Sequence, residues 1–131
     1  MSNPSKAKGT FFESLFVAYL KVRGFVLAER RALHGNADKG DIAGIKDWTF
    51  ETKNRRTLDI PGAIDEARVE ATNAGTRWYA AIVKRPRKAD PSEAIAAMPA
   101  SLLVDLILEL RRMQSLIDAN ELARQQRIGG G

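Results

Sequence analysis

Apolar residues recur at intervals of three and four in three stretches of the chain, which is the spacing that one face of an amphipathic helix requires. In the first stretch Phe12, Phe16 and Tyr19 share a face, and a glycine follows both the first and the second stretch, where helices commonly end. In the third, leucine, methionine and isoleucine follow spacings of 3, 4, 3 and 4 from residue 103 to residue 117. We therefore expect helices over residues 10–23, 59–74 and 101–127.

Shorter apolar runs between turn-forming or charged residues predict strands. The clearest is residues 78–83, and in residues 48–53 apolar and polar side chains alternate. Because successive strand residues point to opposite faces, we expect Glu51 and Lys53 to face a polar cleft and the apolar residues to face a core. The helix between the two strands forms a crossover, which makes the strands parallel neighbours. Further strands are expected over residues 25–29 and 41–45.

The turn at Lys46 and Asp47 would join residues 41–45 and 48–53 in a hairpin. Residues 94–98 fit either a helix or a strand, because alanine favours a helix and the proline that follows would stop one. The ends of the chain contain polar residues and glycine, which are typical of segments without fixed structure. The expected organisation is a flexible basic arm (1–9), one domain (10–100), a helix packed on that domain or on a dimer partner (101–127), and a disordered tail (128–131).

Composition restricts the classes of partner and cofactor. The chain has 21 basic and 16 acidic residues, a net charge of +5, and an isoelectric point near 9.8, which favours a polyanionic partner such as nucleic acid. It has no cysteine and one histidine, His34, so any metal is expected to be a hard cation with oxygen ligands, Mg²⁺ or Mn²⁺. No apolar run reaches about 18 residues and the N-terminus does not resemble a signal peptide, so we expect no membrane partner and a cytoplasmic location.

Two short segments contain residues that suit phosphodiester chemistry. They are Gly40-Asp41-Ile42 and, nine residues later, Glu51-Thr52-Lys53. Two carboxylates and an amine so placed can hold a hard divalent cation and position an attacking water. An acid two positions before a lysine is expected about once by chance in this composition, so the triplet alone is weak.

Each of these residues also has an ordinary structural explanation. Asp41 suits a turn, and Glu51 and Lys53 suit an ion pair on a solvated strand face. Glu13 is three residues after Thr10, the spacing of a capping box, and a role at a metal site is equally compatible with its position. The sequence alone leaves these alternatives open.

The order of an acid on a helix, an aspartate at a strand start and Glu-x-Lys on the next strand resembles the PD-(D/E)xK nuclease superfamily. Within it, residues 6–100 resemble the Holliday junction resolvases of archaea and phages. One departure is that Gly40 stands where the superfamily usually has proline. The resemblance implies an α/β, restriction-endonuclease-like core, with a central mixed sheet flanked by helices in the order αβββαβ, and it favours a last strand at 94–98.

The resemblance also implies a homodimeric, Mg²⁺-dependent endonuclease of DNA recombination and repair, in a bacterial or phage-infected cell, that resolves four-way junctions. Asp41, Glu51 and the Thr52 carbonyl would hold the metal, Lys53 would orient the water or stabilise negative charge, and Glu13 would contact a second metal or its water. The alternatives are a related restriction, repair or packaging nuclease and a non-catalytic nucleic-acid-binding protein. Ten basic residues in segments next to the predicted strands are expected to line a DNA-binding cleft: Lys6, Lys8, Arg30, Arg31, Lys39, Arg55, Arg56, Arg85, Arg87 and Lys88.

Overall fold

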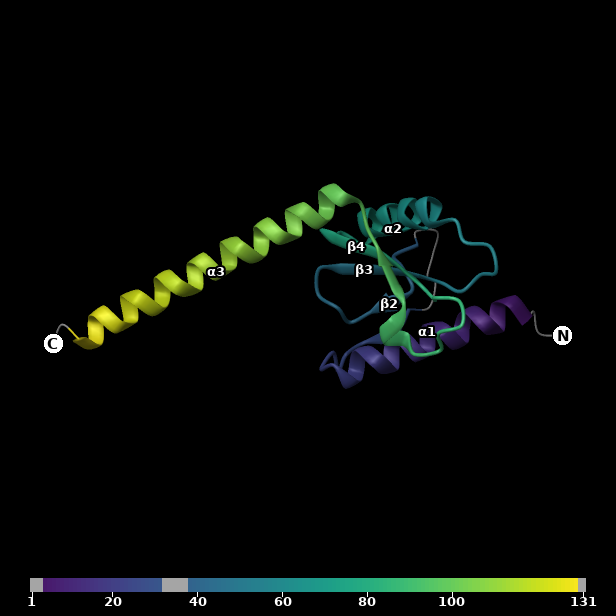
Figure 1. Cartoon of the computed structure of the whole chain (residues 1–131), viewed down its shortest axis with the longest axis horizontal. Coiled ribbons are helices and arrows are strands. Elements are labelled where there is room, and N and C mark those ends of the chain that lie inside the picture. The colour runs from purple at the N-terminus through teal and green to yellow at the C-terminus, as the bar shows by residue number, and fades with distance from the viewer. Residues whose placement is uncertain (1–3, 32–37, 130–131) are drawn as a thin grey trace. The chain divides into compact units, whose positions relative to one another are not determined.

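The protein is an α/β protein, and its computed structural model describes residues 4–31 and 38–129 (Figure 1). His34 and the outermost residues of the predicted arm and tail lie outside these ranges. The chain forms two compact units, Met1–Met98 and Pro99–Gly131. The elements are α1 (Pro4–Val22), β1 (Glu29–Arg30), β2 (Ile42–Ala43), β3 (Trp48–Lys53), α2 (Ile60–Ala74), β4 (Trp78–Val83), a 3₁₀ turn (Pro91–Glu93), β5 (Ile95–Ala97) and α3 (Ala100–Gly129).

The first unit is built on a mixed three-stranded sheet in the order β3-β4-β5. β3 and β4 run parallel with Trp48 opposite Trp78 and Lys53 opposite Val83, as the crossover through α2 predicts. β5 pairs antiparallel with β4, so the segment that fitted either a helix or a strand is a strand. The predicted limits of the strands 48–53 and 78–83 are confirmed.

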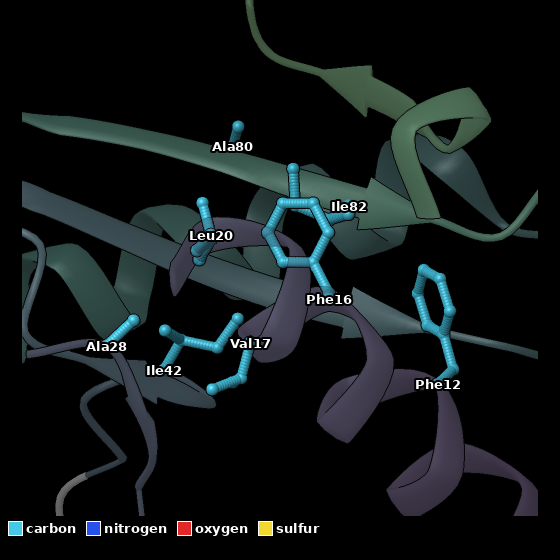
Figure 2. Packing of buried hydrophobic residues seen from close by; sticks show 8 residues of the cluster. All are labelled: Phe12, Phe16, Val17, Leu20, Ala28, Ile42, Ala80 and Ile82. Carbon is cyan, nitrogen blue, oxygen red and sulfur yellow. The ribbon is translucent and has the colours of Figure 1, made fainter. Parts of the chain in front are cut away.

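Helices cover the two faces of this sheet (Figure 1). α1 covers one face, where Phe12 and Phe16 pack with Ala80 and Ile82 of β4 in the larger hydrophobic core (Figure 2). α2 covers the other face, where Ala63 packs against Ala81 and Val83 of β4. Alternate residues of β4 therefore enter the two cores, and β3 contacts both α1 and α2.

The ends of α2 agree with the sequence prediction. The Asp59 carboxylate accepts a hydrogen bond from the Gly62 backbone N–H at 2.9 Å, which caps the first turn. Pro61 is in that turn, where its missing N–H has no cost. Gly75 ends the helix in the left-handed conformation with φ 72°.

The predicted start of the first helix was wrong. α1 begins at Pro4, so the residues up to Gly9 are helical and do not form a flexible arm. Proline suits a first helical turn, and the alanine and lysines that follow are good helix formers that outweigh the single glycine. Thr10 therefore lies inside the helix, which removes the capping-box explanation for Glu13.

The predicted ends of the last helix also need correction. α3 begins at Ala100, directly after Pro99, so Ser101 is a helical residue and not the cap. The helix continues to Gly129, two residues beyond the predicted limit of 127. None of the helices in the described part of the chain is both long and apolar enough to cross a membrane.

The predicted strand over residues 25–29 is also mostly absent. Phe25 and Leu27 lie in an exposed turn closed by a hydrogen bond from the Ala28 N–H to the Phe25 carbonyl at 3.0 Å, and β1 contains only Glu29 and Arg30. The predicted hairpin between residues 41–45 and 48–53 does not form either, because β2 pairs antiparallel with β1. Two backbone hydrogen bonds still link this segment to β3, one from the Asp41 N–H to the Phe50 carbonyl at 3.0 Å and one from the Trp48 N–H to the Ile45 carbonyl at 3.2 Å.

Gly44 is required where the chain leaves β2. Its φ is 92°, and a Cβ built at this position would collide with the Leu27 backbone carbonyl. We expect Gly44→Ala to lower the free energy of unfolding by about 2–4 kcal/mol, from left-handed backbone strain and the collision together. Urea unfolding followed by circular dichroism measures this. The matched control is Gly24→Ala, because Gly24 has φ 108° with no atom within 4 Å of the added carbon. Equal losses in the two variants would show that the close approach has no effect.

Candidate active site

Asp41 is held against β3 through both its backbone and its side chain. Its N–H is bonded to β3, and its Oδ2 accepts hydrogen bonds from the Thr52 N–H at 2.7 Å and the Thr52 Oγ1 at 3.0 Å. Burial raises the pKa of Asp41, and the two Thr52 hydrogen bonds act in the opposite direction. Thr52 therefore fixes the orientation of this carboxylate with its own side chain and backbone N–H.

The backbone before Asp41 requires a glycine and could not accommodate a proline. Gly40 has φ 94°, whereas proline requires a φ near −65°. A Cβ at this position would also lie 2.8 Å from Thr49 Cγ2. Glycine is therefore the residue that lets the chain pass against β3 and deliver Asp41 to its place.

Glu51 lies beneath α2 and faces a second buried carboxyl group, that of Glu70. Their exposed fractions are 6% and 4%, and the Oε2 atom of each lacks a hydrogen-bond donor. Burial raises the pKa of Glu70, and its contact with Glu51 raises the pKa further, to about 11. The pKa of Glu51 is also raised by burial. Without a cation these groups are expected to share a proton, since two buried carboxylates in contact repel each other.

Lys53 is the positive charge next to Glu51. Its Nζ lies 3.2 Å from Glu51 Oε1 and 2.6 Å from Glu66 Oε2 on α2. Burial acts to lower the pKa of Lys53, but the hydrogen bonds and charges of Glu66 and Glu51 outweigh it and the pKa is raised. Lys53 therefore stays a cation at neutral pH, which suits stabilisation of negative charge rather than proton abstraction.

Glu13 reaches the same site from α1. Its Oε1 lies 3.4 Å from Arg30 Nε, and its side chain is 15% exposed. Burial raises the pKa of Glu13, the negative charge of Asp41 raises it further, and Arg30 lowers it. The carboxylates of Glu13 and Asp41 are thus close enough to influence each other's charge.

One cleft contains all the predicted catalytic residues. Glu13, Asp41, Glu51 and Lys53 line it together with Thr52. Four of the ten predicted DNA-binding residues also line it: Lys6, Lys8, Arg55 and Arg56. The other six do not line this cleft in the described part of the chain: Arg30, Arg31, Lys39, Arg85, Arg87 and Lys88.

Three acidic residues of this region were missed by sequence reasoning: Asp38, Glu66 and Glu70. Glu70 lies on the buried face of α2 with Ala63 and Ala67, at spacings of seven and three residues. A carboxyl group on the apolar face of a predicted helix is a recognisable signal, because ionisable residues are rarely buried without a partner. Asp38 precedes the predicted strand in a loop, and nothing in its local sequence distinguishes it.

The carboxylate-rich site fits a hard divalent cation, since Mg²⁺ and Mn²⁺ prefer oxygen ligands.

Comparison with protein families, with curated proteins and with solved structures found no match to this chain. Its function must therefore be inferred from the chemistry and geometry of this cleft.

Proposed function

We propose that this protein is a metal-dependent endodeoxyribonuclease that acts on four-way DNA junctions. The observation that supports this best is the convergence of Asp41, Glu51 and Lys53 in one cleft that has a basic rim. The order of these residues along the chain, which resembles that of the PD-(D/E)xK nucleases, points to the same chemistry. The elements that surround them, a helix bearing Glu13 and a mixed sheet, are compatible with that fold.

Each residue of the cleft would have a separate task. Asp41, Glu51 and the Thr52 carbonyl would hold the cation, which when bound polarises the scissile phosphate and lowers the pKa of a water molecule. Thr52 keeps the Asp41 carboxylate oriented through its two hydrogen bonds. Lys53, held by Glu51 and Glu66, would place a fixed positive charge where negative charge develops on the phosphate.

The rim of the cleft would bind the DNA backbone. Lys6 and Lys8 on α1 and Arg55 and Arg56 after β3 lie on the same cleft as the carboxylates. Such side chains neutralise phosphates without reading bases, so recognition would depend on the shape of the DNA and weaken with salt. A branched substrate is consistent with this kind of binding surface.

A labelled four-way junction and a linear duplex of equal length, each with Mg²⁺ and with EDTA, test the proposal. We expect symmetric nicks in the junction that need Mg²⁺ and are absent with Lys53→Ala. Lys21→Ala, which removes an exposed lysine of α1 outside the cleft, should leave the nicks unchanged. Cleavage of both substrates would instead indicate a general nuclease, and tight binding without cleavage a DNA-binding protein.

Paired incisions in a junction need two active sites, so we propose that the protein acts as a homodimer. α3 supplies a surface for it. The 30-residue helix has no buried residue, although isolated helices gain little stability without packing. Its apolar residues follow the alternating spacing of three and four that suits a helical partner: Leu103, Leu106, Leu110, Met113 and Ile117.

Leu110→Glu is expected to weaken the dimer at least about 100-fold, because each copy loses a buried leucine worth about 1.5–3 kcal/mol and gains a charge at the seam. Leu110 is in the middle of the apolar stripe and 58% exposed in the single chain. Sedimentation velocity over a concentration series measures the change. Ser115→Glu adds the same charge on the opposite side of α3 and should leave the dimer intact. If the Leu110→Glu protein stays dimeric, the interface lies on another surface.

A further inference from the structure

Apart from a proton that the two carboxyl groups can share, no group in the described part of the chain donates to the Oε2 atoms of Glu51 and Glu70. Both residues are more than nine-tenths buried, and neither Oε2 atom has a hydrogen-bond donor. Lys53 does not solve this, because its Nζ is bonded to the other oxygen of Glu51, Oε1. Buried polar atoms without partners are rare in proteins and each one calls for an explanation, such as an ion.

A third carboxylate completes the arrangement. Asp38, Glu51 and Glu70 each offer an oxygen, and these three atoms lie within 4.8 Å of one another. Asp38 Oδ1 also accepts a hydrogen bond from the Gly40 N–H at 2.9 Å, which orients the carboxylate. The Asn73 side chain on α2 donates to the Asp38 carbonyl at 2.7 Å, so the helix that contains Glu70 also anchors Asp38.

We propose that Asp38, Glu51 and Glu70 form a second divalent-cation position, beside the one expected at Asp41 and with Glu51 shared between the two. Three carboxylates converging from a loop, a strand and a helix offer only oxygen ligands, which suits Mg²⁺, Mn²⁺ or Ca²⁺. A single proton could join one pair of these oxygens and would leave the third carboxylate unneutralised. This inference rests on the proposed function only in assuming the Asp41 position.

A cation at this position would connect α2 to β3. Glu70 belongs to the helix, Glu51 to the strand, and the same helix holds Lys53 through Glu66. Binding would therefore fix the helix that positions the cationic residue of the cleft. The stability of the first unit would then depend on divalent cations, since a ligand that binds the folded state stabilises it.

Isothermal titration with Mn²⁺ on the full chain, after removal of metal with EDTA, tests the proposal without using activity. We expect the wild type to bind two Mn²⁺ per chain and Glu70→Gln to bind one. Asp38→Asn should weaken the same position by at least about tenfold. Asp41→Asn should still bind Mn²⁺ at the position that contains Glu70 but not at the position that contains Asp41.

Thermal unfolding with and without Mn²⁺ gives a second readout. The rise in Tm caused by Mn²⁺ should be smaller in Glu70→Gln than in the wild type. Asp65→Asn, which removes an acid of α2 whose side chain is 72% exposed, should behave as the wild type in both experiments.

Two results would overturn the second position. One is unchanged Mn²⁺ binding in Glu70→Gln, which would mean that the pair is joined by a proton. The other is a single Mn²⁺ in the wild type that both Glu70→Gln and Asp41→Asn abolish. Failure of the proposed nuclease function can be told apart from failure of the second cation position. Loss of one Mn²⁺ in Glu70→Gln would support the cation position even if no DNA were cleaved.

Discussion

Replacing Asp41 by asparagine should lower the rate of junction cleavage by about a thousandfold, because loss of metal-assisted charge stabilisation is worth several kcal/mol in the transition state. The side-chain oxygen of asparagine can still accept the hydrogen bonds from Thr52 that hold Asp41 at 2.7 and 3.0 Å. The fold should therefore be retained. Asparagine has no charge to give to a cation, so the effect should fall on the chemical step.

Single-turnover cleavage of a labelled junction in excess protein measures this rate, and a gel-shift titration in Ca²⁺ measures binding. We expect junction affinity within a few-fold of the wild type, because the basic residues of the rim are unchanged. Asp65→Asn is the control for removal of one acidic charge from the exposed surface. Cleavage by Asp41→Asn at the wild-type rate would show that Asp41 is not an active-site residue, and it would contradict the proposed nuclease function.

Glu70→Gln should make the metal-free protein more stable at pH 8 by about 2–4 kcal/mol, and change it little at pH 5. Burial and the charges of Glu51, Asp38 and Asp41 raise the pKa of Glu70 above its usual 4.5. At pH 5, close to this value, protonating the carboxyl on folding costs less than about 1 kcal/mol, so the substitution has a small effect. As the pH rises further, the unfolded chain loses the proton while the folded chain keeps it, and stability falls. Glutamine has no proton to lose.

Urea unfolding in EDTA at pH 5 and pH 8 gives the two free energies for each protein. Subtracting the wild-type free energy of unfolding from that of the variant removes the contribution of the groups that titrate in both proteins. Asp65→Asn should show the wild-type pH dependence, since Asp65 is exposed. If Glu70→Gln were less stable than the wild type at pH 8, the contact between the two carboxyl groups would be favourable in the metal-free protein, contrary to the pKa shift.

The sequence predicted that Glu51 and Lys53 share one face because a strand has a simple period. Residues 48–53 alternate between two faces, and the structure places Lys53 against Glu66 on the face opposite to Phe50. The parallel pairing with residues 78–83 followed from the length of the helical connection. These inferences depended on local patterns, and they placed Glu51 and Lys53 together.

Contacts between distant segments were harder to predict. Glu70 meets Glu51 only when α2 folds over β3, and Asp38, whose carbonyl accepts a hydrogen bond from Asn73 on α2, joins them from a third segment. The pairing of β2 with β1, rather than with β3, depends on backbone conformations that include the positive φ of Gly44. Both outcomes are decided by tertiary packing, which overrides the local preferences that a pattern records.

α1 begins at Pro4 and continues without interruption through Lys6 and Lys8 of the rim to Glu13 and the core residue Phe16. A purification tag fused directly before Pro4 would therefore lie next to the proposed phosphate-binding rim, and we expect it to hinder DNA binding there. If the rim binds DNA as we propose, assays on N-terminally tagged protein would underestimate the affinity, and the tag should be cleaved before binding is measured.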